Sequence, residues 1–193
     1  MKIIAATSNA GKVREIKQIF SDMEIMSMKE IGIDIDIEEN GTTFLENALI
    51  KARTISKLCD CAVLSDDSGL CVDALDGAPG IYSARYAGED ATDEQRYTKL
   101  LSEMEGVKNR AAHFISAVAL VYPDGRELTA EGKVMGTLAF SAKGKNGFGY
   151  DPIFISDEIG KTFAEATDEE KNSISHRKRA LSNLYEKMKA NYA

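Results

Sequence analysis

Two long apolar stretches, nearly adjacent in the sequence, constrain the fold of this chain more than any other feature. Ala111–Tyr122 and Arg126–Phe140 are each long enough for an extended strand, and the PDG sequence at 123–125 is typical of a tight turn. Such a pair predicts a hairpin of two long strands. Shorter apolar runs alternate with helical patterns elsewhere in the chain, so we predict an α/β fold with a mixed sheet.

The remaining stretches supply the shorter elements of this α/β fold. Apolar residues recur at helical spacing in Lys12–Phe20, Thr43–Leu58, Thr92–Met104 and about His176–Lys189. Strands are predicted at Lys2–Ala6, Glu24–Met28, Ala62–Ser65 and Leu70–Asp73. The 193 residues contain no internal repeat or linker, and we predict a single domain that spans residues 1–193.

Charge, hydropathy and cysteine content argue against several classes of protein. The formal net charge is −7, whereas a protein that follows a nucleic-acid backbone normally has a basic surface, so we expect no nucleic-acid partner. The longest apolar stretch, around Phe114–Tyr122, is far shorter than the ~20 residues of a membrane-spanning helix, and we expect no membrane partner. The three cysteines, Cys59, Cys61 and Cys71, make a poor disulfide framework, so we predict a cytoplasmic location.

The segment ATSNAGK, from Ala6 to Lys12, joins the first predicted strand to the first predicted helix through a polar turn. Backbone N–H groups at the start of a helix form a natural phosphate site. The segment is not a P-loop, because Ala6 replaces its first glycine and Val13 stands where serine or threonine should follow the lysine. The residues alone leave two interpretations, a phosphate cradle or a capped helix start with a solvated Lys12.

The glycine-rich segment GKNGFGYDP, at 144–152, is a second candidate for ligand binding. Its glycines have the order GxxGxG and not the GxGxxG of dinucleotide-binding folds, and Asp151-Pro152 follow where a helix would have to begin. An aromatic residue in such a loop can stack on a base, which makes Phe148 and Tyr150 candidates. The alternative is a glycine-rich hairpin whose aromatic residues belong to the core.

The helix predicted at 43–58 carries polar residues near its start. Glu38 and Glu39 precede it, and two adjacent carboxylates there could hold a divalent cation. Asn47 and Lys51 follow four residues apart on its polar side. A solvated polar face and an ordinary acidic loop explain the same residues without a ligand.

Cations gather at the start of the last predicted helix, in EEKNSISHRKRAL at 169–181. Lys171, His176 and Arg177 lie near the positive end of that helix, where each cation is unfavourable by roughly 0.3–1 kcal/mol. An anionic or carbonyl-rich ligand would reverse the sign. The alternative is a cluster of charges on the surface.

Two consecutive aspartates, Asp66 and Asp67, follow an apolar run where a buried strand should end. In an extended strand Val63, Ser65 and Asp67 point to one face, while Leu64 and Asp66 point to the other. The two carboxylates should therefore not lie side by side. One can cap a turn while the other projects into a ligand site, and a turn that explains both remains open.

The chain resembles the inosine triphosphate pyrophosphatase family in six segments, which follow one another as TSNAGK, ENALIKA, SDDSGL, GAPGIYSARYAG, GFGYDPIF and NSISHR. The resemblance covers about residues 3–190. It implies an elongated mixed sheet flanked by helices in two lobes, with the nucleotide in a cleft between them. It also implies a homodimer that uses Mg²⁺ and cleaves ITP, dITP or XTP to the monophosphate and pyrophosphate.

The same resemblance assigns roles to individual residues. It implies that Asp67 is the proton acceptor and that Glu38 and Asp67 hold the metal. It implies substrate contacts for Thr7, Ser8, Asn9, Ala10, Gly11, Lys12, Ser68, Phe148, Gly149, Tyr150, Asp151, Lys171, His176 and Arg177. Lys51 is a further candidate for a phosphate contact, and Asp66 is interpreted as a turn residue or a support behind the site.

The inventory of side chains suits this chemistry. Hydrolysis of a metal-bound triphosphate needs neutralised charge and a water aimed at phosphorus, and a carboxylate can orient or deprotonate that water. Arg177 has only donors, so we predict that it recognises the carbonyl oxygen at position 6 of the base. Two other interpretations stay open, a pyrophosphatase for other nucleotides such as modified pyrimidines and a non-catalytic nucleotide sensor, which would not need Glu38 and Asp67 together.

Overall fold

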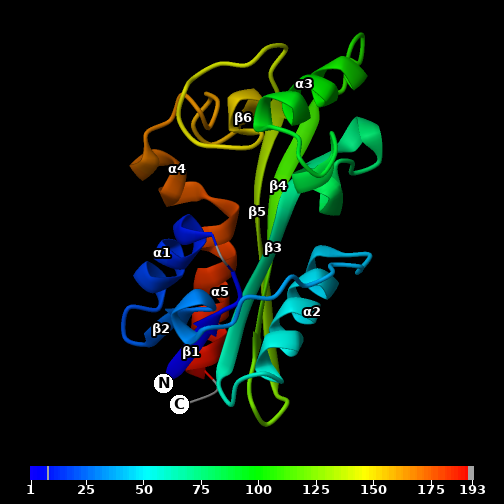
Figure 1. Ribbon diagram of the computed structural model, residues 1–193. Helices are drawn as coiled ribbons and strands as arrows, with labels where there is room; N and C mark the ends of the chain where they lie inside the picture. Colours follow the sequence, from blue (N-terminus) through cyan, green and yellow to red (C-terminus); the bar gives the residue numbers. More distant parts are fainter. Residues whose placement is uncertain (8, 191–193) are drawn as a thin grey trace. The chain divides into compact units, whose positions relative to one another are not determined.

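The computed structural model describes residues 1–7 and 9–190, and within them the chain forms a six-stranded sheet with helices against it (Figure 1). The strands are β1 (Lys2–Ala5), β2 (Glu24–Ser27), β3 (Ala62–Val72), β4 (Ala111–Val121), β5 (Glu127–Leu138) and β6 (Phe154–Ser156). The helices are α1 (Ala10–Ile19), α2 (Phe44–Ser56), α3 (Asp93–Glu103), α4 (Asp168–Ile174) and α5 (His176–Ala190). Short 3-10 helices occupy Lys29–Ile31, Asp73–Leu75, Gly80–Arg85 and Asp151–Ile153.

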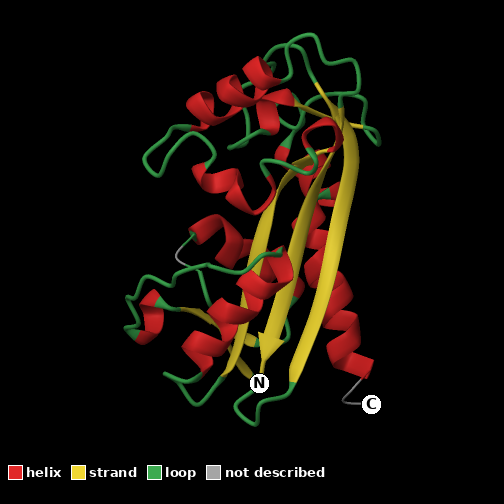
Figure 2. Cartoon of the chain, turned by 90° about the vertical axis from the view of Figure 1, so that its right-hand side faces the viewer, coloured by secondary structure: helices red, strands yellow, loops and turns green. Residues whose placement is uncertain are grey.

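The sheet is mixed, as the sequence predicts. Its strand order is β2-β1-β3-β4-β5-β6. β1 pairs in parallel with β2 and with β3, whereas β5 pairs antiparallel with β6. Figure 2 shows the long strands running beside one another. The predicted α/β class is confirmed.

The chain folds into two compact units. Unit 1 contains Met1–Asp67, Ser116–Gly132 and the chain from Arg177 onward, and unit 2 contains Ser68–Ile115 and Lys133–His176. Each of the long strands β3, β4 and β5 contributes residues to both units. These units correspond to the two lobes that the family resemblance implies.

Helices cover both faces of the sheet in unit 1, with α1 and α5 on one face and α2 on the other (Figure 1). Side chains alternate between these faces along each strand. Ile3 and Leu64 pack in the cluster with α1 and α5, whereas Ile4 and Val63 pack in the cluster with α2. This double burial explains why the strand sequences here are almost continuously apolar.

β3 differs from the prediction. It runs from Ala62 to Val72 without interruption, so the turn predicted between Ala62–Ser65 and Leu70–Asp73 is wrong. The interpretation of Asp66 as a turn residue is wrong for the same reason. By propensity, the polar residues in the middle of this strand indicate a turn. They fit a strand here because the charges of Asp66 and Asp67 are paired inside the protein.

Unit 2 has a core of aromatic rings. Phe114 and Phe154 meet edge to face with centroids 4.7 Å apart, and Phe163 stacks on Phe114 at 5.8 Å. Leu100 of α3 is fully buried in the same cluster. This core supports the glycine-rich loop and the helix α4.

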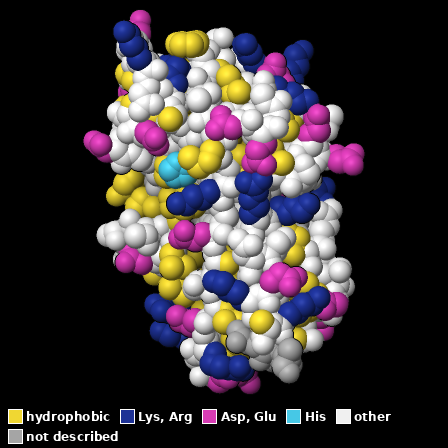
Figure 3. Space-filling view, turned by 180° about the vertical axis from the view of Figure 1, so that it is seen from behind, with side chains coloured by type: hydrophobic (Ala, Val, Ile, Leu, Met, Phe, Trp, Pro, Cys, Tyr) yellow, Lys and Arg dark blue, Asp and Glu magenta, His cyan; other side chains and the backbone are white. Residues whose placement is uncertain are grey.

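The surface carries charges of both signs. On the face shown in Figure 3, Lys and Arg side chains lie among Asp and Glu side chains. This mixture agrees with the net charge of −7. Within the part of the chain that the structure describes, every helix is too short or too polar to cross a bilayer.

Candidate functional site

The polar turn before α1 is organised by Asn9. Its side-chain oxygen accepts hydrogen bonds from the backbone N–H groups of Gly11 (2.9 Å) and Lys12 (3.2 Å), and its own N–H donates to Thr7 Oγ1 (3.1 Å). Asn9 is thus the N-cap of α1. Ala10 is the first residue of the helix, and Ser8 lies outside the described residues.

Lys12 is held by an ion pair and is not a solvated lysine. Its ammonium lies 3.0 Å from Asp66 Oδ2, and its side chain is 22% exposed. The bonds to Asn9 bear out the capped helix start. The second half of that interpretation, a solvated Lys12, is therefore wrong.

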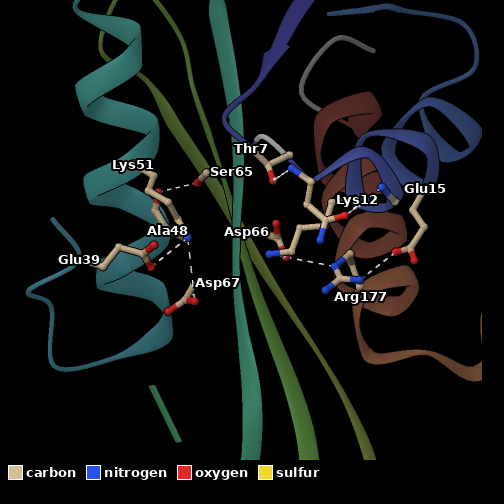
Figure 4. Close-up of polar contacts among 12 residues, drawn as sticks. Thr7, Lys12, Glu15, Glu39, Ala48, Lys51, Ser65, Asp66, Asp67 and Arg177 are labelled. Carbon is tan, nitrogen blue, oxygen red and sulfur yellow. Dashed lines mark hydrogen bonds and ion pairs between the residues drawn. The ribbon is translucent and has the colours of Figure 1, made fainter. Parts of the chain in front are cut away.

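Asp66 is the buried centre of a charge network on the α1 and α5 side of β3 (Figure 4). Its Oδ2 accepts from Lys12 and from Arg177 Nε at 3.1 Å, and Arg177 Nη1 donates to Glu15 at 3.2 Å. Within the described residues, Asp66 Oδ1 has no hydrogen-bond partner. That oxygen belongs to a residue that lines a cavity, so it is available to a ligand or a water.

The protonation of this network follows from its charges. Burial would raise the pKa of Asp66, but Lys12, Arg177 and Lys51 outweigh burial and hold that pKa well below its usual range. Burial would lower the pKa of Arg177, and the neighbouring Asp66 and Glu15 raise it instead. Asp66 and Arg177 are therefore both charged at neutral pH.

Asp67 faces the other way, toward α2. Asn47 Nδ2 donates to Asp67 Oδ2 at 3.1 Å, and Lys51 Nζ lies 3.9 Å from Asp67 Oδ1 and 3.0 Å from Glu39 Oε2 (Figure 4). Asn47 and Lys51 reach these carboxylates together because they are one turn apart on α2. The two faces predicted for Asp66 and Asp67 are confirmed.

The helix and loop around Asp67 are fixed by bonds to the backbone. Asn47 Oδ1 accepts from the N–H of Gly41 at 2.9 Å. A side chain at Gly41 would collide with Asn47, so this position needs glycine. Ser65 Oγ donates to the carbonyl of Ala48 and thereby joins β3 to α2.

The pKa of Asp67 moves in the direction opposite to that of Asp66. Burial raises it, Glu39 raises it further, and Lys51 and Asn47 only partly oppose them. A carboxylate with a raised pKa is a stronger base than an ordinary one. Asp67 is therefore a stronger base than Asp66, and its predicted role as proton acceptor stays a prediction.

The structure gives Glu38 and Glu39 different environments, and the metal contact that the resemblance implies for Glu38 stays a prediction. Glu38 is exposed, whereas Glu39 is half-buried and shares Lys51 with Asp67. Within the described chain, His, Cys, Asp and Glu side chains nowhere form a group of three that could hold a metal ion. The pair of Glu39 and Asp67 still fits Mg²⁺, because that ion is usually held by one or two protein carboxylates together with substrate phosphates.

One cavity of unit 1 collects these charged residues. Its volume is about 550 Å³, within the range of ~300–1,000 Å³ that is usual for small-molecule sites. Lys12 and Asp66 line it from one side of β3, Lys51 and Glu39 come from α2 and the loop before it, and Thr7 comes from the polar turn. Residues 32–37, which the sequence analysis did not single out, line it as well.

The glycine-rich loop of unit 2 forms a separate group. Asp151 is buried, accepts from the N–H of Phe148 at 2.9 Å and forms an ion pair with Lys171. The Lys171 ammonium also lies 4.6 Å from the centroid of the Phe148 ring. The side chain at the tip of this loop is thus an exposed aromatic ring beside a cation.

The two aromatic candidates of this loop have different environments. Phe148 is 58% exposed, whereas Tyr150 is 4% exposed and donates its hydroxyl to the carbonyl of Ser83 at 2.8 Å. Burial raises the pKa of Tyr150 well above its usual value. Tyr150 is therefore a core residue that shapes the loop, and Phe148 is the ring that a base could reach.

The remaining predicted residues lie in both units. His176 stacks on Phe114 with centroids 4.9 Å apart, and Ser68 is a half-buried residue of β3 in unit 2. Arg177 belongs to unit 1, where Asp66 and Glu15 hold it. Its predicted contact with the base stays a prediction. Asp93 was missed by the sequence analysis, although its carboxylate accepts from the N–H of Gly149 at 2.7 Å.

Comparisons with known proteins identify the family to which the chain belongs. The chain matches the model of the Ham1 family over residues 3–187. It is 50% identical over 198 residues to a dITP/XTP pyrophosphatase of Clostridium perfringens, with 97% of both chains covered. It is 51% identical over 188 residues to a dITP/XTP pyrophosphatase of Thermoanaerobacter sp., with 95% of this chain and 94% of the relative covered.

Solved structures give the same result. The Ham1 protein of Staphylococcus aureus superposes with a TM-score of 0.94 at 41% identity, covering 99% of this chain and 100% of the other. A HAM1 protein of Coxiella burnetii gives a TM-score of 0.92 at 40% identity, covering 98% and 99%. These matches span nearly the whole chain, as the six sequence segments predict, and they confirm the family resemblance. The chain belongs to the Ham1 family.

Proposed function

We propose that this protein hydrolyses the non-canonical purine nucleoside triphosphates ITP, dITP and XTP to their monophosphates and pyrophosphate. This activity would remove these nucleotides before they are incorporated into DNA or RNA. Relatives about half identical over nearly their whole length bear the name dITP/XTP pyrophosphatase. The observation that carries the proposal is the cavity that Lys12, Lys51, Glu39 and Asp66 line beside Asp67.

The cations of this cavity suit a triphosphate. Lys12 and Lys51 line it, and both ammonium groups are now paired with carboxylates, Lys12 with Asp66 and Lys51 with Glu39. Phosphate oxygens would compete with those carboxylates for the same donors. The N-terminus of α1, which begins at Ala10, adds a favourable dipole.

Mg²⁺ would be held by Asp67 and by one of the adjacent glutamates, Glu38 or Glu39. Lys51 donates to Glu39 and also lies near Asp67, which places the Glu39 carboxylate close to Asp67 and favours Glu39 as the ligand. When bound, the ion would supply positive charge to the phosphate oxygens. The protein's own part is to keep Asp67 and Glu39 close together, which Lys51 does by contacting both.

Asp67 would orient the attacking water and accept its proton. Asn47 fixes the direction of the carboxylate through its amide, and burial raises its pKa. Attack at the α-phosphorus would release pyrophosphate. In unit 2, the exposed Phe148 ring would stack on the base, with Lys171 beside it.

We further propose that the protein acts as a homodimer in the cytoplasm. Cys59, Cys61 and Cys71 are all free thiols, which suits a reducing compartment. Size-exclusion chromatography with light scattering would test the dimer. A mass of one chain, 21.1 kDa, would contradict it.

The activity can be tested with a panel of nucleotides and Mg²⁺. We expect pyrophosphate release from ITP, dITP and XTP at a far higher kcat/KM than from ATP or GTP. Chromatography should give IMP, and not IDP, as the first product of ITP. Preference for a modified pyrimidine triphosphate, or binding of ITP without hydrolysis, would contradict the proposal.

A further inference from the structure

Asp93 connects two parts of unit 2 that are far apart in the sequence. It is the first residue of α3, and its carboxylate Oδ2 accepts from the N–H of Gly149, 56 residues away, at 2.7 Å. Its other oxygen pairs with Arg96 at 2.6 Å. The start of α3 does not need this carboxylate as a cap, because Thr92 and Gln95 already form a complete capping box.

The loop that receives this bond has an unusual backbone. Gly147 and Gly149 have φ angles of 77° and 61°, in the left-handed region that favours glycine, and Phe148 lies between them. A side chain at Gly147 would collide with Asp151. The conformation of Phe148 therefore depends on what holds the peptides on either side of it.

Two carboxylates hold consecutive N–H groups at this point. Asp151 accepts from Phe148 N at 2.9 Å and Asp93 accepts from Gly149 N at 2.7 Å. Asp151 belongs to the same loop, whereas Asp93 comes from a regular helix. Hydrogen bonds to an ionised carboxylate are stronger than those between neutral groups. Asp93 thus ties the exposed Phe148 ring to a rigid element.

We infer that Asp93 is a positioning residue for nucleobase recognition, which it affects through Gly149 and Phe148. This inference rests on the proposed function, because it takes Phe148 as the residue that stacks on the base. Asp93 itself touches no reacting atom. Its loss should weaken binding of the nucleotide and leave the hydrolytic step, which depends on Asp67, nearly unchanged.

The kinetic test uses variants of the full chain. Asp93→Ala should raise KM for ITP about tenfold or more, because it removes a hydrogen bond to a charged group, while kcat stays within about threefold. Asp93→Asn keeps an acceptor oxygen and should recover part of the affinity. Glu94→Ala is the matched control, because it removes an exposed carboxylate from the same first turn of α3. A fall in kcat at constant KM, or an equal effect of Glu94→Ala, would overturn the inference.

A second measurement needs no hydrolysis. The chain contains no tryptophan, so Phe148→Trp introduces a single fluorescent reporter on the loop. Adding Asp93→Ala to this variant should lower the anisotropy of the reporter, whereas adding Glu94→Ala should leave it unchanged. Equal anisotropy in all three proteins would overturn the inference. Because no nucleotide is present, this result is separate from success or failure of the proposed function.

A further variant, Asp93→Ser, provides the test if Asp93→Ala does not fold. Asp93→Ser keeps a residue that is well accepted at a helix start, and its side chain is too short to reach Gly149. It should reproduce the KM and anisotropy changes of Asp93→Ala. Normal values of both quantities in a folded Asp93→Ser protein would overturn the inference.

Discussion

The two faces of β3 shift the pKa values of two chemically identical side chains in opposite directions. Asp66 points toward α1 and α5, where Lys12 and Arg177 hold its pKa well below the usual range. Asp67 points toward α2, where burial and Glu39 raise its pKa in spite of Lys51. The first carboxylate is therefore a fixed anion that anchors cations, and the second is available to exchange a proton.

The difference shows what determines the role of a buried carboxylate. Both residues are removed from water to a large degree, so burial alone does not separate them. What separates their pKa values is the number of neighbouring cations and their distance from each carboxylate. Asp66 has two at about 3 Å, whereas the cation of Asp67 is at 3.9 Å and lies closer to Glu39 than to Asp67. One face of β3 places Asp66 beside cations, and the other places Asp67 near a second carboxylate, Glu39. Adjacent positions of one strand therefore carry both kinds of aspartate.

Asp67→Asn should have the largest effect on activity. The amide keeps the size of the side chain but cannot accept the proton, and loss of a general base typically costs 10²–10⁴-fold in rate. Steady-state release of pyrophosphate from ITP with Mg²⁺ would measure this. Turnover above about a third of the wild-type value would contradict the role of Asp67.

Asp66→Asn should have the largest effect on stability. It leaves Lys12 and the buried Arg177 without their shared anion, and breaking a buried ion pair from one side typically costs about 3–5 kcal/mol. Denaturant unfolding followed by circular dichroism would measure the change. Glu15→Gln is the matched control, because it removes only the half-buried partner of Arg177, and its effect should be clearly smaller. Equal losses in the two variants would mean that Asp66 is not the centre of the network.

Arg177→Ala tests the Asp66 face of β3 through a smaller expected effect, a change in base selectivity. If Arg177 also recognises the oxygen at position 6 of the base, its loss should narrow the ITP-to-ATP ratio of kcat/KM about tenfold, because adenine has a donor at that position. The ITP-to-GTP ratio should change much less, since guanine also carries the 6-oxo group. Equal slowing of all three nucleotides would restrict Arg177 to its network with Asp66 and Glu15.

Much of the fold could be predicted because apolar periodicity records burial. The helices α1, α2 and α3 and the long strands β4 and β5 lie close to their predicted bounds. β6 and α4 were not predicted, since three and seven residues are too few to show a period. The break predicted in β3 failed because polar residues in a strand were taken for a turn, although Ser65, Asp66 and Asp67 each have a partner inside the protein.

The candidate site could be predicted in part. The faces of Asp66 and Asp67 followed from strand geometry alone. The choice between Glu38 and Glu39 depends on the path of an irregular loop, which no period in the sequence describes. The bond between Asp93 and Gly149 joins residues 56 positions apart, so only the folded chain reveals it.

The opposite pKa shifts of Asp66 and Asp67 also predict how stability depends on pH in the metal-free protein. The pKa of Asp66 is lowered on folding, so its stabilising contribution is present above the unfolded value of about 3.8 and is lost as the pH falls through the lower folded value. The pKa of Asp67 is raised, so its ionisation costs stability as the pH rises from the unfolded to the folded value. Asp67→Asn should therefore be at least as stable as the wild type at neutral pH, as unfolding in the presence of EDTA would show. A clear loss of stability in that variant would mean that ionised Asp67 stabilises the fold.

Titration of the side-chain carboxyl carbons by ¹³C NMR, without metal, would compare the two aspartates in one experiment. Asp66→Asn and Asp67→Asn would assign their signals. We expect the Asp67 signal to titrate above the ordinary value of 3.8 and the Asp66 signal to remain that of an ionised carboxylate well below it. Coincident midpoints, or an Asp66 that takes up its proton at the higher pH, would contradict the division of roles between the two faces of β3.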